Sequence, residues 1–135
     1  YRRLKKIFSQ VYISAKTNKF DFDCDIIYDK SDDISSPMVA LKSILESINN
    51  SKIFILTVDI PLLTTNTIKK LIQNSSNYDI TIAKDNYKTH NLCGVYSITL
   101  LYKVQQYLLD DNHKINHLIK SSNYYELYIN NDDEF

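Results

Sequence analysis

The sequence predicts a three-layer α/β sandwich built on a mixed, mainly parallel sheet. Short runs of β-branched and aromatic residues alternate with amphipathic segments of about ten residues, which is the order of βαβ units. The run 53–58 is apolar at successive positions, which is typical of a strand covered on both faces. With 135 residues, the chain is long enough for one domain with a core and too short for two ordinary ones. We therefore expect a single domain over residues 1–135.

The first half of the chain predicts two helices and two short strands. Apolar residues at helical spacing indicate a helix within 1–10, and β-rich runs indicate strands at 11–15 and 26–28. The second of these strands ends at Asp29. A further helix is expected to begin at Pro37, because proline is tolerated at the first helical position and the apolar residues that follow lie on one face.

The second half begins with the apolar run 53–58, which ends at Asp59. Thr64 or Thr65 can cap the helix that follows, because a hydroxyl accepts a hydrogen bond from the first turn. Further strands are expected at 78–84, 92–98 and 124–129, and further helices at 99–111 and 115–120.

Composition excludes several classes of protein. The 16 basic and 16 acidic residues balance, and no long basic run predicts a nucleic-acid surface. No apolar run approaches the roughly 20 residues that cross a bilayer, and no signal-peptide pattern is present. We expect a cytoplasmic protein without a membrane partner. Cys24 and Cys93 follow no metal-binding spacing and are expected to be free thiols.

The chain contains a single glycine, Gly94, where about nine are expected for this length. A loop that cradles phosphates needs several glycines, because its backbone must turn tightly and approach the ligand. No such loop is present in the sequence. The first residue is Tyr1 and the last segment has no closing turn signal, so we expect a domain truncated at both ends.

Three motifs resemble metal-binding or catalytic sites, but an ordinary structural role explains each of them better. Residues 21–25 resemble the start of a calcium loop, but the glycine and glutamate that the loop requires are replaced by Ile26 and Asp32. His113 and His117 have the spacing of a zinc-protease motif without its glutamate, so a polar surface is expected. Cys93 has no activating base nearby in sequence and is expected to be a buried apolar residue.

Asp29 and Asp59 are the strongest candidate site residues. Both close predicted strands, and parallel strands end at one edge of a sheet, where open α/β folds bind ligands. Two carboxylates there suit Mg²⁺ and nucleotide binding better than acid–base hydrolysis. His90, at a loop-to-strand junction, could face the same crevice, although a structural role is favoured for it.

Several motifs together resemble the molybdenum cofactor guanylyltransferases, a branch of the nucleotidyltransferases. VDIPLL at 58–63 is similar to that family's Cys-Asp-x-Pro segment. SSPMVAL at 35–41 is similar to its Gly-Pro-Leu-Ala-Gly helix entry, with Ser36 and Leu41 or its neighbour in place of the glycines, and HNLCGVYS at 90–97 to its Pro-Leu-x-Gly-x-Tyr strand, with Asn91 in place of the proline. The resemblance covers roughly Leu4 to Phe135. It implies a Rossmann-like nucleotidyltransferase fold whose N-terminal strand and glycine-rich loop are missing from this chain.

The resemblance also implies an activity, which is transfer of GMP from GTP to molybdopterin with release of pyrophosphate. Asp59 would be the catalytic residue that holds Mg²⁺, and Ser14 and Asp29 would contact the nucleotide, with Pro37 and His90 as further candidates. The implied partners are the small-molecule substrates, and molybdoenzymes or other proteins of molybdenum cofactor biosynthesis. The chain departs from the family at the missing loop, so the activity belongs to the parent protein.

Two alternatives remain open from the residues alone. The parent protein could be a cytidylyltransferase or another nucleotidyltransferase of the same fold, because the spacing of motifs does not reveal the nucleobase. The chain could also be a non-catalytic α/β interaction module that kept the scaffold. The absent glycine loop favours the module, and the two strand-end aspartates favour an enzyme.

Overall fold

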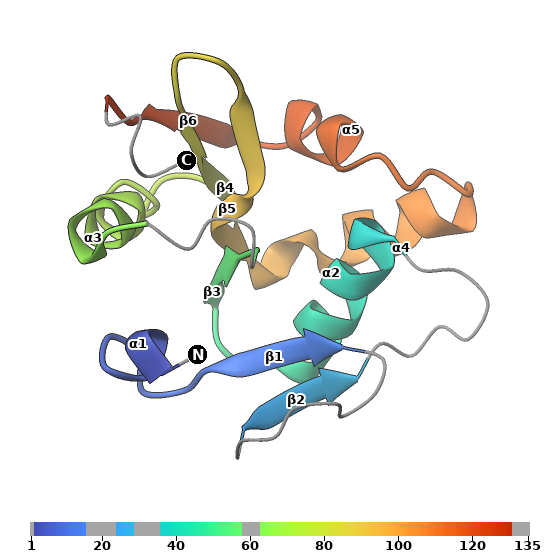
Figure 1. The fold of residues 1–135 in the computed structure, drawn as a ribbon. Helices are drawn as coiled ribbons and strands as arrows, with labels where there is room; N and C mark the ends of the chain where they lie inside the picture. Colours follow the sequence, from blue (N-terminus) through green and yellow to red (C-terminus); the bar gives the residue numbers. More distant parts are fainter. Residues whose placement is uncertain (1, 16–23, 29–35, 58–62, 131–135) are drawn as a thin grey trace.

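The computed structural model contains two β-sheets with helices on both sides (Figure 1). It describes residues 2–15, 24–28, 36–57 and 63–130. The helices are α1 (Arg2–Lys5), α2 (Pro37–Ser47), α3 (Thr65–Gln73), α4 (Leu101–Leu109) and α5 (Ile115–Lys120), and a 3₁₀ turn, η1 (Ile98–Leu100), precedes α4. The strands are β1 (Tyr12–Ala15), β2 (Asp25–Tyr28), β3 (Lys52–Leu56), β4 (Ile80–Lys84), β5 (Thr89–Ser97) and β6 (Tyr124–Tyr128).

Helix α2 begins where the sequence predicts. The Ser36 side chain accepts a hydrogen bond from the backbone N–H of Val39, and Pro37 occupies the first helical position. Its apolar face is buried, with Met38 and Leu41 almost fully inaccessible. Helix α3 is capped in the same way by Thr64, which accepts from the backbone N–H of Thr67. Thr65 is then the first residue of that helix.

The larger sheet has four strands in the order β3-β5-β4-β6. β5 is antiparallel to both of its neighbours, whereas β6 is parallel to β4. Strands β3, β4 and β6 therefore share one direction, and the expectation of a mixed, mainly parallel sheet is confirmed. β5 is reversed because its short connection to β4 forms a hairpin, whereas a parallel crossover needs a dozen or more residues. β1 and β2 form a separate parallel pair.

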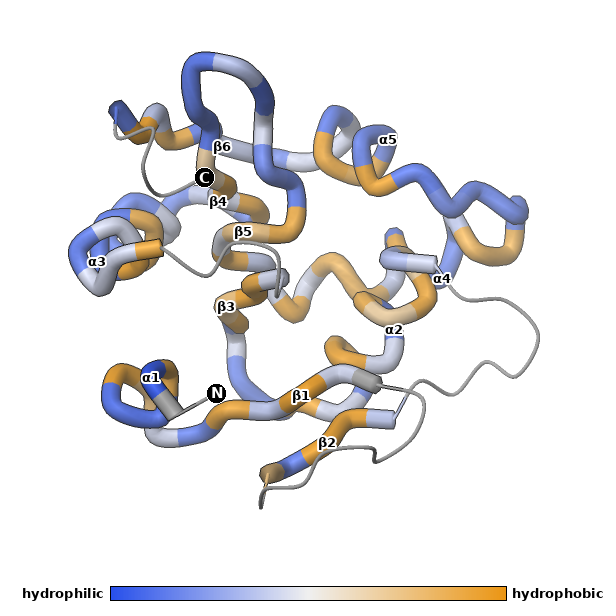
Figure 2. Tube along the Cα trace, viewed as in Figure 1, coloured by the Kyte–Doolittle hydropathy of each residue, from blue (hydrophilic) through white to orange (hydrophobic). Residues whose placement is uncertain are grey.

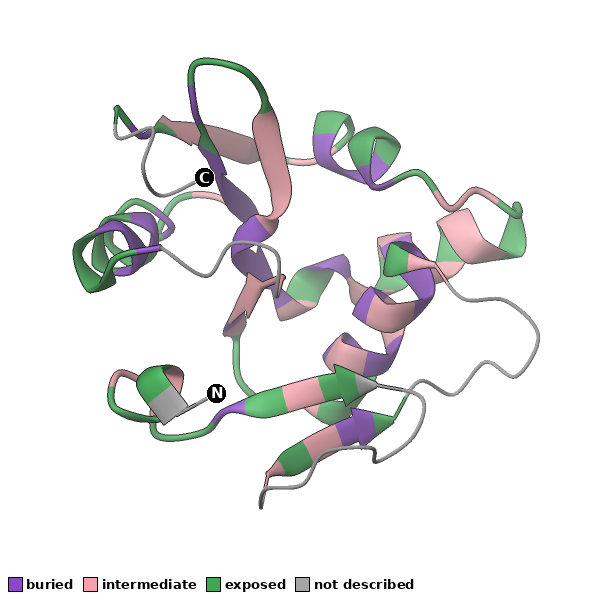
Figure 3. Ribbon diagram, in the orientation of Figure 1, coloured by how far each residue is buried: buried purple, intermediate pink, exposed green. Residues whose placement is uncertain are grey.

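Helices cover both faces of the four-stranded sheet, which gives the three layers. Helices α2, α4 and α5 pack on one face and enclose an apolar cluster containing Ile53 and Ile82. The second cluster, which includes Phe54 and Cys93, packs on the other face against α3 and the segment around α1. Apolar residues are concentrated on the strands and on the helix sides that face them (Figure 2). Buried residues concentrate in β4, in β5 and on the inner sides of α2 and α3 (Figure 3).

Gly94 lies in the middle of β5, opposite Ile55 of β3 and Ile82 of β4. A Cβ at this position would lie 2.0 Å from the carbonyl oxygen of Thr81 and 2.8 Å from the Cα of Ile82. The only glycine of the sequence therefore stands where two backbones approach too closely for any side chain.

Tyr96, two residues later in β5, is fully buried, and its hydroxyl donates to the backbone carbonyl of Asn91. Burial raises the pKa of the Tyr96 phenol well above its ordinary value, so the hydroxyl keeps its proton and remains a donor. Tyr96 thereby fixes the first residues of β5. Within the described ranges, no helix has the length and apolar character needed to cross a membrane.

Candidate functional site

The carboxyl ends of β3, β4 and β6 lie at the same end of the larger sheet, here called the sheet edge. β5 begins at this end. The register places Leu56 of β3 opposite Cys93, and Lys84 of β4 opposite both Thr89 of β5 and Tyr128 of β6. The segments that follow β3, β4 and β6 therefore leave the sheet at the same edge. Because open α/β folds bind ligands outside the carboxyl ends of their strands, polar groups here are the first candidates for chemistry.

An aspartate and a histidine form a pair at this edge. Asp85 follows β4, and its Oδ2 lies 2.9 Å from Nε2 of His90 in β5. The two side chains are only 7% and 9% exposed, respectively. Oδ1 of Asp85 accepts the backbone N–H groups of Tyr87 and Lys88 at 2.7 and 2.8 Å. One carboxylate thus closes the hairpin turn and holds the imidazole ring.

The pair has a defined protonation pattern. The hydrogen bond from His90, together with the backbone donors of Lys88 and Tyr87, lowers the pKa of Asp85 from 3.8 to about 2. At neutral pH the carboxylate therefore only accepts hydrogen bonds, and Nε2 of His90 must carry the hydrogen. His90 is therefore held in one orientation at the sheet edge. Such a residue can position a ligand, or it can stabilise the hairpin between β4 and β5.

The lowered pKa of Asp85 predicts a stability change in acid. The ionised carboxylate is favoured in the folded state, so its contribution is complete above pH 3.8 and is lost as the pH falls toward about 2. We expect the free energy of unfolding of the natural chain to exceed that of Asp85→Asn near pH 5 and to approach it near pH 2. Urea unfolding of both proteins across this range measures the difference. A difference that stays constant down to pH 2 would contradict the assignment.

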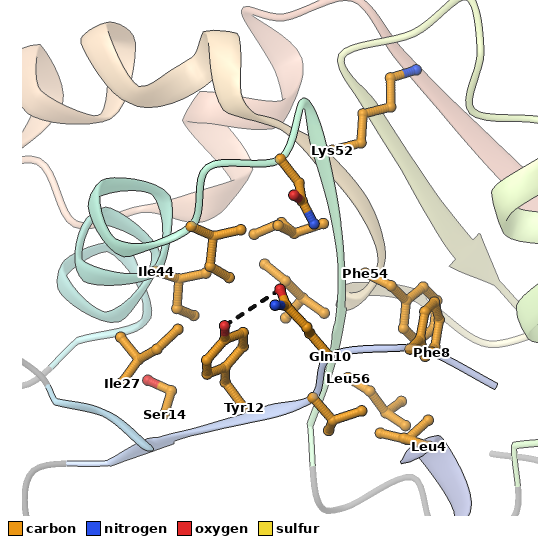
Figure 4. A pocket seen from close by; sticks show the side chains of 15 residues that line it. Leu4, Phe8, Gln10, Tyr12, Ser14, Ile27, Ile44, Lys52, Phe54 and Leu56 are labelled. Atoms are coloured by element: carbon orange, nitrogen blue, oxygen red, sulfur yellow. Dashed lines mark hydrogen bonds between the residues drawn. The ribbon is translucent and has the colours of Figure 1, made fainter. Parts of the chain in front are cut away.

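Ser14 lies on β1 and is exposed. It lines a cavity of about 250 Å³ between β1 and β3, together with Tyr12, whose hydroxyl donates to Oε1 of Gln10 at 3.4 Å (Figure 4). Most of the described residues around this cavity are apolar. Lys52 is the one cation among them, and its ammonium group donates to the carbonyl of Ser75. The lining suits an apolar group better than a triphosphate.

The N-terminus of α2 is fixed by a second histidine. Oγ of Ser36 lies 2.7 Å from Nδ1 of His113, and Nε2 of His113 lies 3.0 Å from Oδ1 of Asp111. This chain of hydrogen bonds ties the helix start, including the exposed Pro37, to the loop between α4 and α5. His113 is therefore more than a polar surface residue, whereas His117, in α5, contacts Asn112.

Asp29 and Asp59 lie outside the described residues, so their assignment stays a prediction. The part of the chain that the structure describes contains no group of three or more His, Cys, Asp or Glu residues arranged to hold a metal ion. A magnesium site at Asp59 therefore rests on the sequence alone.

The other predicted residues lie on three separate elements. Ser14 belongs to the two-stranded sheet, Pro37 begins α2, and His90 belongs to β5. Of these, only Ser14 lines the cavity. Sequence reasoning missed Asp85, the partner of His90. The signal was present as an Asp between two predicted strands, five residues before a histidine, but an aspartate in that position is also an ordinary turn residue.

A family model and several named relatives identify one family. The family model described as the MobA-like NTP transferase domain matches residues 1–126. A protein named molybdenum cofactor guanylyltransferase from Campylobacter jejuni subsp. doylei is 35% identical over 135 residues, covering 98% of this chain and 71% of the relative. One of the same name from Campylobacter jejuni subsp. jejuni is 37% identical over 115 residues, covering 84% of this chain and 60% of the relative.

A crystal structure of a protein from Aquifex aeolicus matches with a TM-score of 0.88 and 30% identity, covering 96% of this chain and 69% of the other. This likeness supports the three-layer fold with its mixed sheet. Across these relatives the chain spans between 60% and 71% of the length of the protein it matches.

Proposed function

The chain belongs to the family of MobA-like NTP transferase domains, and on this premise we propose that its parent protein transfers GMP from GTP to molybdopterin, releasing pyrophosphate. The observation that carries the proposal is the 35% identity to a molybdenum cofactor guanylyltransferase over 98% of this chain. GTP and molybdopterin are then the small-molecule partners. Molybdoenzymes or other proteins of molybdenum cofactor biosynthesis are candidate protein partners.

The proposed reaction is attack of the molybdopterin phosphate on the α-phosphorus of GTP, with pyrophosphate as the leaving group. Such a displacement depends mainly on in-line positioning and on neutralising charge. In this proposal Asp59 holds Mg²⁺, which favours carboxylate and phosphate oxygens and would neutralise phosphate charge. Asp29 and Ser14 would position the nucleotide.

The position of His90 supports a role in ligand binding for the sheet edge at which it lies. Its ring is held by Asp85 beside the carboxyl ends of β3 and β4, where ligands bind in this fold class. A ring fixed at that edge can help to shape a binding site without moving during the reaction. Pro37 would contribute by starting α2 at a fixed place.

The proposal is tested with the full-length protein, GTP and molybdopterin. We expect GMP transfer with GTP and little with CTP, measured as dinucleotide product by mass spectrometry. Comparable transfer from CTP would replace the guanylyltransferase assignment with a cytidylyltransferase one. No transfer from either nucleotide, in a protein that is folded, would favour a non-catalytic module.

The 135-residue chain by itself is expected to release no measurable pyrophosphate from GTP in the presence of molybdopterin. Its single glycine is buried in β5, so the chain has no glycine-rich loop to hold the β- and γ-phosphates. The measurement is a coupled pyrophosphate assay run beside the full-length protein. Steady turnover by the 135-residue chain would show that such a loop is unnecessary.

A further inference from the structure

The first turn of α2 is held in place by a side chain from a distant loop. Oγ of Ser36 accepts the backbone N–H of Val39 and lies 2.7 Å from Nδ1 of His113, in the loop between α4 and α5. The other ring nitrogen of His113, Nε2, lies 3.0 Å from Oδ1 of Asp111. The side chain of His113 is only 25% exposed, whereas that of Asp111 is 86% exposed. The imidazole ring therefore joins the start of α2 to the loop that follows α4.

The position of each hydrogen in this chain follows from its outer partner. A carboxylate only accepts hydrogen bonds, so Nε2 of His113 carries the hydrogen that points to Asp111. In the neutral ring Nδ1 is then the acceptor, and the Ser36 hydroxyl donates to it. Oγ keeps a lone pair for the N–H of Val39. Ser36 thus both donates and accepts, and its hydroxyl is fixed in one orientation.

The loop that carries His113 is itself held in a defined shape. Asp111 has a φ of 55°, in the left-handed region, which aspartate adopts more readily than most residues other than glycine. The backbone N–H groups of Asp111 and Asn112 donate to carbonyls in the last turn of α4. Oδ1 of Asn112 accepts the backbone N–H of Lys114. The ring of His113 is therefore presented to α2 from a fixed position.

The start of α2 lies on the side of the fold at which β1 and β2 end. These two strands are parallel, so their carboxyl ends lie together, and α2 is the next element after β2. In Figure 1 the arrowheads of β1 and β2, the start of α2 and the loop between α4 and α5 all lie on the right-hand side of the view. Open α/β folds bind ligands outside the carboxyl ends of their strands, so the position of this helix start affects the binding region.

We propose that His113 is a positioning residue for the nucleotide, and that it acts through Ser36 by fixing the first turn of α2. The inference rests on the proposed function, in which Ser14 of β1 contacts GTP. Ser14 lines the same cavity as Ile44 of α2, so a shift of the helix changes the space beside Ser14. His113 itself touches no substrate. It lowers the cost of binding because the helix start is already in place when GTP arrives.

The test compares two substitutions at His113 in the full-length protein. His113→Asn places an amide on the carbon that carries Nδ1, so it keeps a partner for Ser36 and loses the contact with Asp111. His113→Gln places the amide near the position of Nε2, so it keeps a partner for Asp111 and loses the contact with Ser36. His117→Asn is the matched control, because His117 is an exposed histidine of α5 that contacts Asn112 instead.

We expect His113→Gln to raise the KM for GTP about fivefold, the size of one lost hydrogen bond, and to change kcat less than about twofold. His113→Asn is expected to keep KM within about twofold of the natural value, and His117→Asn should leave both constants unchanged. Hydrogen–deuterium exchange of the Val39 amide, which donates to Ser36, should become faster in His113→Gln alone. A purely structural role would have a different signature, because partial unfolding reduces the amount of active protein and therefore kcat, while KM stays the same.

Three results would overturn the proposal. One is an equal rise of KM in His113→Asn and His113→Gln, which would mean that Ser36 does not carry the effect. The others are an unchanged KM in His113→Gln and a loss of kcat without a change in KM. If the natural protein transfers no GMP, the Kd of GTP from isothermal titration calorimetry replaces KM, and the same ratios are expected. Absence of GTP binding to the natural protein would overturn this proposal together with the proposed function.

Discussion

Gly94→Ala is expected to lower the free energy of unfolding by about 3 kcal/mol, at the upper end of the usual range for over-packed cores. The added methyl group would lie 2.0 Å from the carbonyl oxygen of Thr81. That oxygen belongs to the backbone of β4, so a change of side-chain rotamer cannot relieve the contact. The strands must separate, which weakens the ladders that β5 forms with β3 and β4.

The size of this effect is measurable by urea unfolding. Domains of this kind are typically stable by about 5–15 kcal/mol, so a loss of about 3 kcal/mol shifts the midpoint clearly. Lys88→Ala, an exposed change in the adjacent hairpin, is the control and is expected to stay within about 0.5 kcal/mol. A Gly94→Ala protein destabilised by less than about 1 kcal/mol would mean that the sheet adapts to the extra atom.

In the full-length protein, Asp59→Asn is expected to slow GMP transfer about a hundredfold, which corresponds to roughly 3 kcal/mol. Asparagine keeps the size and much of the hydrogen bonding of aspartate but lacks the negative charge that a hard divalent cation requires. If Asp59 only closed a turn, asparagine would serve nearly as well, because both residues form the same local backbone bonds. The substitution therefore separates a metal ligand from a turn residue.

The measurement for Asp59→Asn is single-turnover transfer at saturating Mg²⁺ and GTP. Thermal unfolding in parallel shows whether the variant is folded. Asp110→Asn, an exposed aspartate at the end of α4, is the matched control and should transfer GMP at the natural rate. A folded Asp59→Asn protein that keeps more than about a third of the natural rate, less than roughly 1 kcal/mol of effect, would show that Asp59 does not hold the catalytic metal.

The order of helices and strands could be predicted from the sequence because the signals are local. Ser36 and Pro37 mark the start of α2 within two residues, and Thr64 caps α3 through a bond to the third residue after it. The buried residues of these helices are mostly apolar, although Ser43 and Thr67 are buried and Ile72 is exposed, so periodicity identifies the helices. Within the described ranges each predicted helix and strand has a counterpart in the structure, although β5 begins three residues before the predicted strand 92–98.

Other features depend on contacts between distant segments and could not be predicted in this way. The sequence shows Gly94 only as a lone glycine, because its role comes from the backbone of a neighbouring strand. The sequence predicts only a polar surface role for His113. Its contact with Ser36 could not be predicted, because the two residues are 77 positions apart and only the fold brings them together. At the candidate site, sequence identified His90 without its partner Asp85. Asp29 and Asp59 remain predictions from motif and strand-end position.

The two strands that pair with β4 lie at very different distances from it along the sequence, and this difference affects the order in which the sheet forms. β5 follows β4 after a short hairpin, whereas the partner of Ile80 in β6 is Tyr124, far later in the sequence. Closing the longer loop costs more entropy and slows the second pairing. During synthesis from the N-terminus, β4 and β5 can associate while β6 is still unmade. The outer edge of β4, whose Ile80 and Ile82 are fully buried in the finished fold, then stays open to other nascent chains until the last strand arrives.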